Sequence, residues 1–69
     1  MKLSARNILK GQVKKVSKGA VNTEVVISLS GGVEVVSIIT NASSESLGLK
    51  EGKTAYAIIK ASNVMVGVD

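Results

Sequence analysis

The chain has 69 residues and a net charge of +4, and it contains neither cysteine nor histidine. This length allows one small domain, so residues 1–69 are treated as a single unit. Without cysteine there are no disulfides and no thiolate metal ligands, and without histidine the commonest metal ligand and general base is missing. The composition therefore argues against an enzyme and against direct protein–metal bonds, whereas the positive charge indicates an anionic partner.

The stability and location of so small a chain can also be predicted. A domain of this size buries only about 60% of the surface of its unfolded chain and usually needs disulfides, a metal or oligomerisation. The first two are excluded, so we expect copies of the chain to associate. No apolar run is long enough to cross a membrane, and the N-terminus lacks a signal-peptide pattern. We therefore expect a cytoplasmic protein with no membrane partner.

The first predicted strand spans residues 6–17. Leu9, Gly11 and Val13 share one face, and the alternation breaks at Lys14-Lys15, where we expect a β-bulge. Gly11 indicates a strong bend or the close approach of another backbone.

The second and third strands are predicted at residues 22–30 and 33–40, joined by a hairpin at Gly31-Gly32. The third strand is apolar on both faces, which indicates burial on both. A domain this small cannot cover both faces itself. We therefore expect part of the sheet to pack on a neighbouring subunit.

The second half of the chain predicts one helix and two strands. The helix is expected at residues 41–49, with Ser43 as its N-cap and Gly48 as its C′ residue. The strands are expected at residues 54–60 and 64–68. An all-β chain of five strands, with one short helix between the third and the fourth, has the layout of an OB-fold, a five-stranded Greek-key barrel.

Two stretches could bind an anion. Ser4-Ala5-Arg6-Asn7 places three hydrogen-bond donors directly before the first strand. In the turn Ser17-Lys18-Gly19-Ala20, Gly19 would allow a positive φ and leave neighbouring N–H groups free to form an anion-binding nest. The alternatives are a solvated strand start for the first stretch and an ordinary hairpin turn for the second. Neither stretch decides the question by itself.

The chain resembles the molbindins, small molybdate-binding proteins also called Mop domains. The stretches that carry the resemblance are, in chain order, Ser4-Ala5-Arg6-Asn7 with Lys10-Gly11, Lys18-Gly19-Ala20-Val21-Asn22, Ile39-Thr40 with Ser43, Leu47-Gly48-Leu49-Lys50-Glu51-Gly52-Lys53, and Ile59-Lys60-Ala61-Ser62. No single stretch is specific, but the five together, in this order and spacing, span almost the whole chain.

The resemblance implies a single Mop domain that assembles into a homohexamer, a trimer of dimers, and binds molybdate or tungstate between subunits with no further cofactor. Because binding between subunits would couple ligand uptake to assembly, we also expect a role in intracellular molybdate storage or homeostasis. The residues implied for a first type of oxyanion site are Ser4, Arg6, Thr40, Ser43, Lys60 and Ala61. Those implied for a second type, where copies meet around a three-fold axis, are Lys18, Gly19, Ala20, Val21 and Asn22.

The main alternative is a nucleic-acid-binding OB-fold module, which the basic charge and the fold both favour. Binders of single strands stack bases on aromatic side chains, however, and this chain has one aromatic residue, Tyr56, which we expect to face inward. A structural oligomer without any ligand is a further alternative. It predicts that Arg6→Ala leaves oxyanion affinity unchanged.

Overall fold

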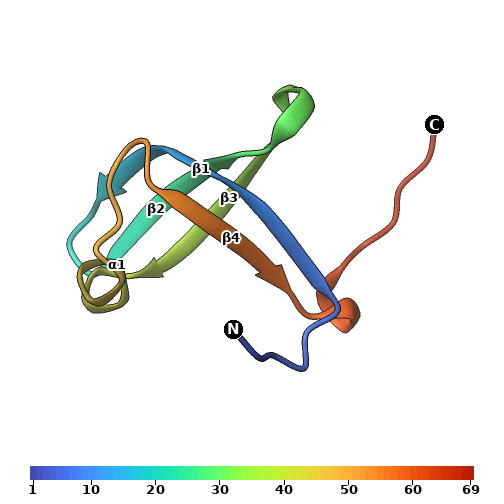
Figure 1. The fold of residues 1–69 in the computed structure, drawn as a ribbon, viewed down its shortest axis with the longest axis horizontal. Coiled ribbons are helices and arrows are strands. Elements are labelled where there is room, and N and C mark those ends of the chain that lie inside the picture. Colours follow the sequence, from blue (N-terminus) through green and yellow to red (C-terminus); the bar gives the residue numbers. More distant parts are fainter.

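The computed structural model describes residues 1–69 and shows a curled antiparallel β-sheet with one short helix (Figure 1). Its elements are β1 (Asn7–Lys18), β2 (Asn22–Ser28), the 3₁₀ turn η1 (Ser30–Gly32), β3 (Glu34–Thr40), α1 (Asn41–Leu47), β4 (Thr54–Ile59) and the 3₁₀ turn η2 (Ala61–Asn63). No helix is long and apolar enough to cross a membrane.

β1 organises the sheet, whose strand order is β3-β2-β1-β4. Its first half pairs with β4, from Asn7 to Gln12, and its second half pairs with β2. The register with β2 shifts between Val13 and Lys15, which confirms the predicted bulge. Val13, which is in register with Ile27, also donates from its N to Lys53 O (2.9 Å) and accepts at its O from Gly52 N (2.8 Å). The bend at the bulge allows the single long strand β1 to pair with both β4 and β2.

Two glycine predictions for the sheet are confirmed. A Cβ at Gly11 would lie 2.4 Å from the carbonyl oxygen of Ser28, so another backbone does approach closely there. Gly31 and Gly32 both have φ near +81° and form the turn of the β2–β3 hairpin. Leu29 N closes this hairpin with a 2.7 Å bond to Val33 O.

The fully buried apolar core is small. It consists of Val13, Val25, Ile27 and Ala57. Outward-facing Val36 and Ile38 of β3 are 59% and 61% exposed, so one chain leaves this apolar face uncovered. Their packing against a second copy remains a prediction.

The expected fifth strand and closed barrel are wrong for the single chain. Residues 64–68 are assigned to no strand, and the sheet has four strands with β3 and β4 as its free edges. The alternation of Val64, Val66 and Val68 does indicate a strand-like segment, but alternation does not specify a partner. In this chain the segment leaves the sheet and extends away from it (Figure 1).

Three local predictions also need correction. α1 ends at Leu47, and its N-cap is Thr40 rather than Ser43, because the Thr40 hydroxyl accepts the hydrogen bond from Ser43 N. Gly48, with φ near +61°, does terminate the helix as predicted. Tyr56, expected inside, is 43% exposed, because Ala55 and Ala57 occupy the inward positions of β4.

Candidate anion-binding site

The register between β1 and β4 brings Arg6 and Lys60 together. Asn7 pairs with Ile59 at the end of the ladder, so the next residue on each strand is Arg6 on one side and Lys60 on the other. The Asn7 side chain strengthens this end, because its Nδ2 donates a 3.1 Å hydrogen bond to Ile59 O. Two segments more than fifty residues apart in sequence are thereby held side by side.

A surface hollow of about 470 Å³ lies at this junction. The residues that line it come from the segment before β1 and from the segment after β4, namely Ser4, Ala5, Arg6, Lys60, Ala61 and Ser62. Two of them are cations and two carry hydroxyl groups. None of the five acidic residues of the chain is among them.

The charge in this hollow is uncompensated within the chain. The ion pairs of the molecule are Lys14–Glu34 and Lys18–Glu45, and neither involves Arg6 or Lys60. Both side chains are exposed, and an anion between them would be attracted by both charges. Arg6, Lys60 and the hydroxyls of Ser4 and Ser62 can all donate hydrogen bonds, so the hollow has the chemistry of an oxyanion site.

Thr40 and Ser43 do not line this hollow. They lie at the start of α1, where Thr40 Oγ1 accepts from Ser43 N (3.1 Å) and donates to Ser43 Oγ (2.8 Å). β3, which leads into α1, is the sheet edge opposite β4. One chain therefore brings together Ser4, Arg6, Lys60 and Ala61, but holds Thr40 and Ser43 apart from them.

The residues expected in the second type of site form the turn between β1 and β2. Gly19 N donates to Asn22 O (2.8 Å), and Asn41 holds the turn through Nδ2 to Gly19 O (3.0 Å) and N to Val21 O (2.8 Å). The expected positive φ at Gly19 is wrong. Glycine is needed there for space, because a Cβ would lie 2.9 Å from Asn22 O.

The charge of the same turn is partly balanced. Lys18 Nζ lies 3.3 Å from Glu45 Oε1, a contact between two exposed side chains. Ala20 and Val21 donate no backbone hydrogen bond within the chain, so their N–H groups are available to a ligand or to another subunit. The turn therefore supplies donors for a ligand or for another subunit.

The sequence did not indicate the structural roles of three residues, Ser62, Asn41 and Asn7. Ser62 lines the hollow, although only the adjacent Lys60-Ala61 was chosen. Asn41 organises the β1–β2 turn and accepts a 2.6 Å hydrogen bond from the buried Thr23 hydroxyl. Asn7, expected as a free donor, is occupied by Ile59 O. Thr23 is a polar residue on the apolar face of a strand, and a buried hydroxyl needs a hydrogen-bond partner. That requirement could have indicated a structural role for a polar residue such as Asn41.

Comparison with known proteins decides the family. The TOBE domain model matches residues 3–66. The chain belongs to the TOBE domain family. Among its relatives, a probable molybdenum-pterin-binding protein of Haemophilus influenzae is 51% identical over 100% of both chains. Molybdenum-pterin-binding protein 3 of Clostridium pasteurianum is 52% identical, covering 96% of this chain and 97% of its own. These relatives confirm the Mop-type resemblance.

Solved structures agree with this TOBE domain in fold. MopII from Clostridium pasteurianum superposes with a TM-score of 0.92 at 45% identity, over 97% of this chain and 100% of its own. The cytoplasmic molybdate-binding protein ModG, with molybdate bound, gives 0.95 at 54% identity, and the match covers 100% of this chain and 49% of ModG. A molybdate-binding protein from Sporomusa ovata gives 0.92 at 37% identity, over 99% of this chain and 100% of its own.

Proposed function

We propose that this protein is a non-catalytic binder of molybdate or tungstate. The observation that carries the proposal is the hollow where Arg6 and Lys60 stand side by side with two serine hydroxyls and no carboxylate. Support comes from ModG, which is 54% identical to this chain and holds molybdate in its structure. No further cofactor is needed for this role.

The ligand's chemistry matches the donors in the hollow. Molybdate is a tetrahedral dianion whose oxygens only accept hydrogen bonds near neutral pH, so it needs converging donors and no competing acceptor. Burying a dianion without compensation is very costly, and Arg6 and Lys60 supply opposite charge. Hydrogen bonds to charged groups contribute about 1.5–3 kcal/mol each. A few such bonds are sufficient for micromolar binding.

The proposed first site is shared between copies. Thr40 and Ser43 lie apart from the hollow in one chain, so a second copy would bring them to it. The proposed assembly is a homohexamer built as a trimer of dimers. The exposed Val36 and Ile38 give such an assembly apolar surface to bury. The second proposed site lies at the turn from Lys18 to Asn22, where copies would present their free N–H groups to one anion.

The proposed role is intracellular storage or homeostasis of the oxyanion. A ligand that binds only the assembled form stabilises it by mass action, so filling and assembly are coupled. Such a protein takes up molybdate when it is plentiful and releases it when the free concentration falls. The proposed location is the cytoplasm, and the related ModG is described as cytoplasmic.

Isothermal titration of the purified protein with molybdate, tungstate and sulfate tests the proposal. We expect saturable binding of molybdate or tungstate at micromolar concentration and weaker binding of sulfate. Native mass spectrometry of the same samples gives the number of subunits and of anions. Absence of heat with both metal oxyanions would overturn the binding proposal, and a monomer at every concentration would overturn the shared site.

A further inference from the structure

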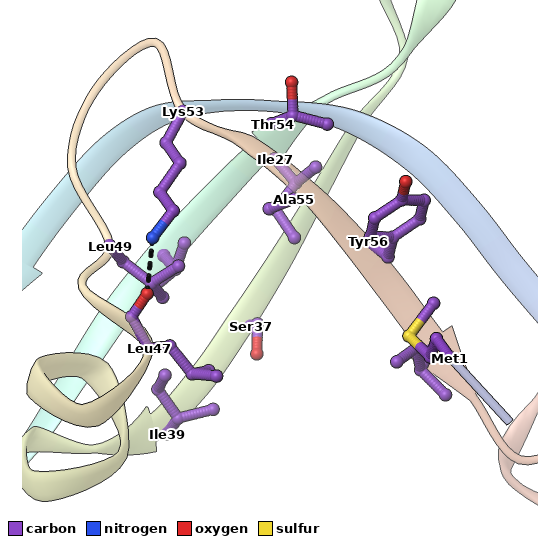
Figure 2. A pocket seen from close by; sticks show the side chains of 12 residues that line it. Met1, Ile27, Ser37, Ile39, Leu47, Leu49, Lys53, Thr54, Ala55 and Tyr56 are labelled. Atoms are coloured by element: carbon purple, nitrogen blue, oxygen red, sulfur yellow. Dashed lines mark hydrogen bonds between the residues drawn. The ribbon is translucent and has the colours of Figure 1, made fainter. Parts of the chain in front are cut away.

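The short helix α1 lies beside the turn between β1 and β2 and is fastened at both of its ends (Figure 1). At its C-terminal end Lys53 Nζ donates to Leu47 O (2.7 Å) and to Gly48 O (3.3 Å), and Figure 2 shows the first of these bonds. At its N-terminal end Asn41 is bonded to the turn through its side chain and its backbone. The helix is therefore a firm support from which Asn41 acts on the turn.

The side-chain amide of Asn41 has one orientation that satisfies both of its neighbours. The hydroxyl of Thr23, a residue only 1% exposed, donates a 2.6 Å hydrogen bond to Asn41 Oδ1. On the other side, Asn41 Nδ2 donates a 3.0 Å hydrogen bond to Gly19 O. A carbonyl oxygen only accepts, so it must face Nδ2, and this leaves Oδ1 for the buried hydroxyl. Thr23 and Gly19 together fix the direction of the amide.

Asn41 in turn fixes the direction of the peptide groups in the turn. Its Nδ2 holds Gly19 O and its backbone N holds Val21 O (2.8 Å), so both carbonyl oxygens face α1. The chain has no cis peptide bond, and a planar trans peptide has its N–H on the side opposite its C=O. The Gly19–Ala20 peptide therefore directs the Ala20 N–H away from α1, where it has no partner within the chain.

An oxyanion needs donors that face it and no carbonyl oxygen beside them, because its own oxygens only accept. We propose that Asn41 is a positioning residue for the second oxyanion site: it draws Gly19 O towards α1 and thereby presents the Ala20 N–H to the ligand. Asn41 does not touch the oxyanion but acts through the Gly19–Ala20 peptide. The inference rests on the proposed function, because it needs an oxyanion at the turn.

The effect of Asn41 should be confined to the turn. The cap of α1 depends on Thr40 Oγ1 and on Ser43, and not on the Asn41 side chain. The hollow that contains Arg6 and Lys60 is built from the segments that flank β1 and β4. Truncation of Asn41 therefore leaves the residues proposed for the first site in place.

A residue-resolved titration tests the proposal, because the two sites have different backbone reporters. ¹⁵N–¹H spectra of the parent and of Asn41→Ala are recorded during titration with sodium molybdate, with the amide of Ala20 reporting on the turn and that of Ala61 on the hollow. We expect the dissociation constant at Ala20 to rise about ten-fold in Asn41→Ala, the equivalent of one lost hydrogen bond to an anion, and that at Ala61 to stay unchanged. Gln12→Ala removes an exposed amide outside both sites and should match the parent at both reporters.

The other outcomes of the titration overturn the positioning role. Equal weakening at Ala20 and Ala61 would show a general structural effect, and an unchanged affinity at Ala20 would show that the turn does not need Asn41. If molybdate shifts only the Ala61 amide of the parent, the second site and this inference fail while the proposed function stands. If molybdate shifts neither amide, both fail.

A double variant separates positioning from stability. Asn41→Ala alone leaves the buried Thr23 hydroxyl unpaired, which destabilises the fold. Asn41→Ala/Thr23→Val also removes that hydroxyl and should recover stability in urea unfolding, so it carries the titration even if the single variant does not fold. If Asn41 positions the turn, the affinity at Ala20 stays weak in the double variant although its stability recovers. An affinity that recovers together with stability would contradict the positioning role.

Discussion

Asn7 fastens the start of β1 to the end of β4 by donating a 3.1 Å hydrogen bond from its side chain to the carbonyl oxygen of Ile59. The two residues are also paired in the strand register, so the bond fixes Arg6 next to Lys60. Without an anion this arrangement holds two like charges together with no carboxylate near them. The hollow is therefore electropositive, and an anion bound there would offset the charge of both side chains.

Arg6→Ala should therefore change ligand binding much more than the stability of the ligand-free protein. In the absence of oxyanion the substitution alters an exposed side chain without an ion pair, so the free energy of unfolding should stay within about 0.5 kcal/mol of the parent. Molybdate affinity should fall roughly 10- to 100-fold, the equivalent of one lost charge-assisted bond. Thermal unfolding and isothermal titration measure the two effects. Lys50→Ala, which removes a lysine outside the hollow, should leave affinity unchanged, and equal affinities for both variants would refute the site.

Asn7→Ala should weaken molybdate binding without removing a ligand contact. Loss of the bond to Ile59 O costs about 1 kcal/mol in the free energy of unfolding and loosens the ends of β1 and β4. Affinity should fall several-fold, because the donors of the hollow are then less well held. Denaturant unfolding and titration test this, with Gln12→Ala on the same strand as the control. If the two variants bind molybdate equally, Asn7 does not position the site.

Gly11→Ala should destabilise the fold strongly. The added methyl group would lie 2.4 Å from the carbonyl oxygen of Ser28 and 2.9 Å from Ile27 Cγ2, so backbone would have to shift. Overpacking of this kind costs typically 1–3 kcal/mol, and we expect that loss in urea unfolding. Gly67→Ala, which meets no atom within 4 Å, should be neutral or slightly stabilising. A neutral Gly11→Ala would show that β1 can move away from β2.

Much of the sheet followed from local sequence signals. The bulge beside Lys15, the close approach at Gly11 and the hairpin at Gly31-Gly32 each depend on a few neighbouring residues, whose steric preferences act wherever the chain lies. The helix C-terminus at Gly48 is of the same kind. For the fifth strand, by contrast, the alternation in residues 64–68 predicts a strand but does not specify its partner, and the segment joins no sheet in the single chain.

The candidate site was predictable only in part. The donors Ser4, Arg6 and Lys60 could be chosen by residue type, and the family resemblance linked them. That they meet depends on the pairing of Asn7 with Ile59, which lies 52 positions away in the sequence. The sequence also predicts Ser43 as the N-cap of α1, whereas the cap is Thr40. Several hydroxyl residues near a helix start are equivalent in sequence, and only the backbone geometry selects one.

Stability measurements should distinguish Thr40 from Ser43 in the absence of ligand. Thr40→Ala removes the acceptor of the 3.1 Å bond from Ser43 N and should cost about 1 kcal/mol in the free energy of unfolding. Ser43→Ala keeps that acceptor and loses only the 2.8 Å bond between the two hydroxyls, so it should cost less. The reverse order in urea unfolding would contradict the assigned cap.

Mixed oligomers should show whether the α1 start of one chain completes the hollow of another. Arg6→Ala and Ser43→Ala chains should each bind molybdate weakly when pure. If a site takes Arg6 from one subunit and Ser43 from its neighbour, refolding the two variants together creates some sites in which both residues are native. Titration of the mixture should then reveal a tight class of sites that neither variant has alone. If both residues served a site from the same chain, no mixture could restore it, so a mixture that binds only as weakly as its components would rule out the shared site.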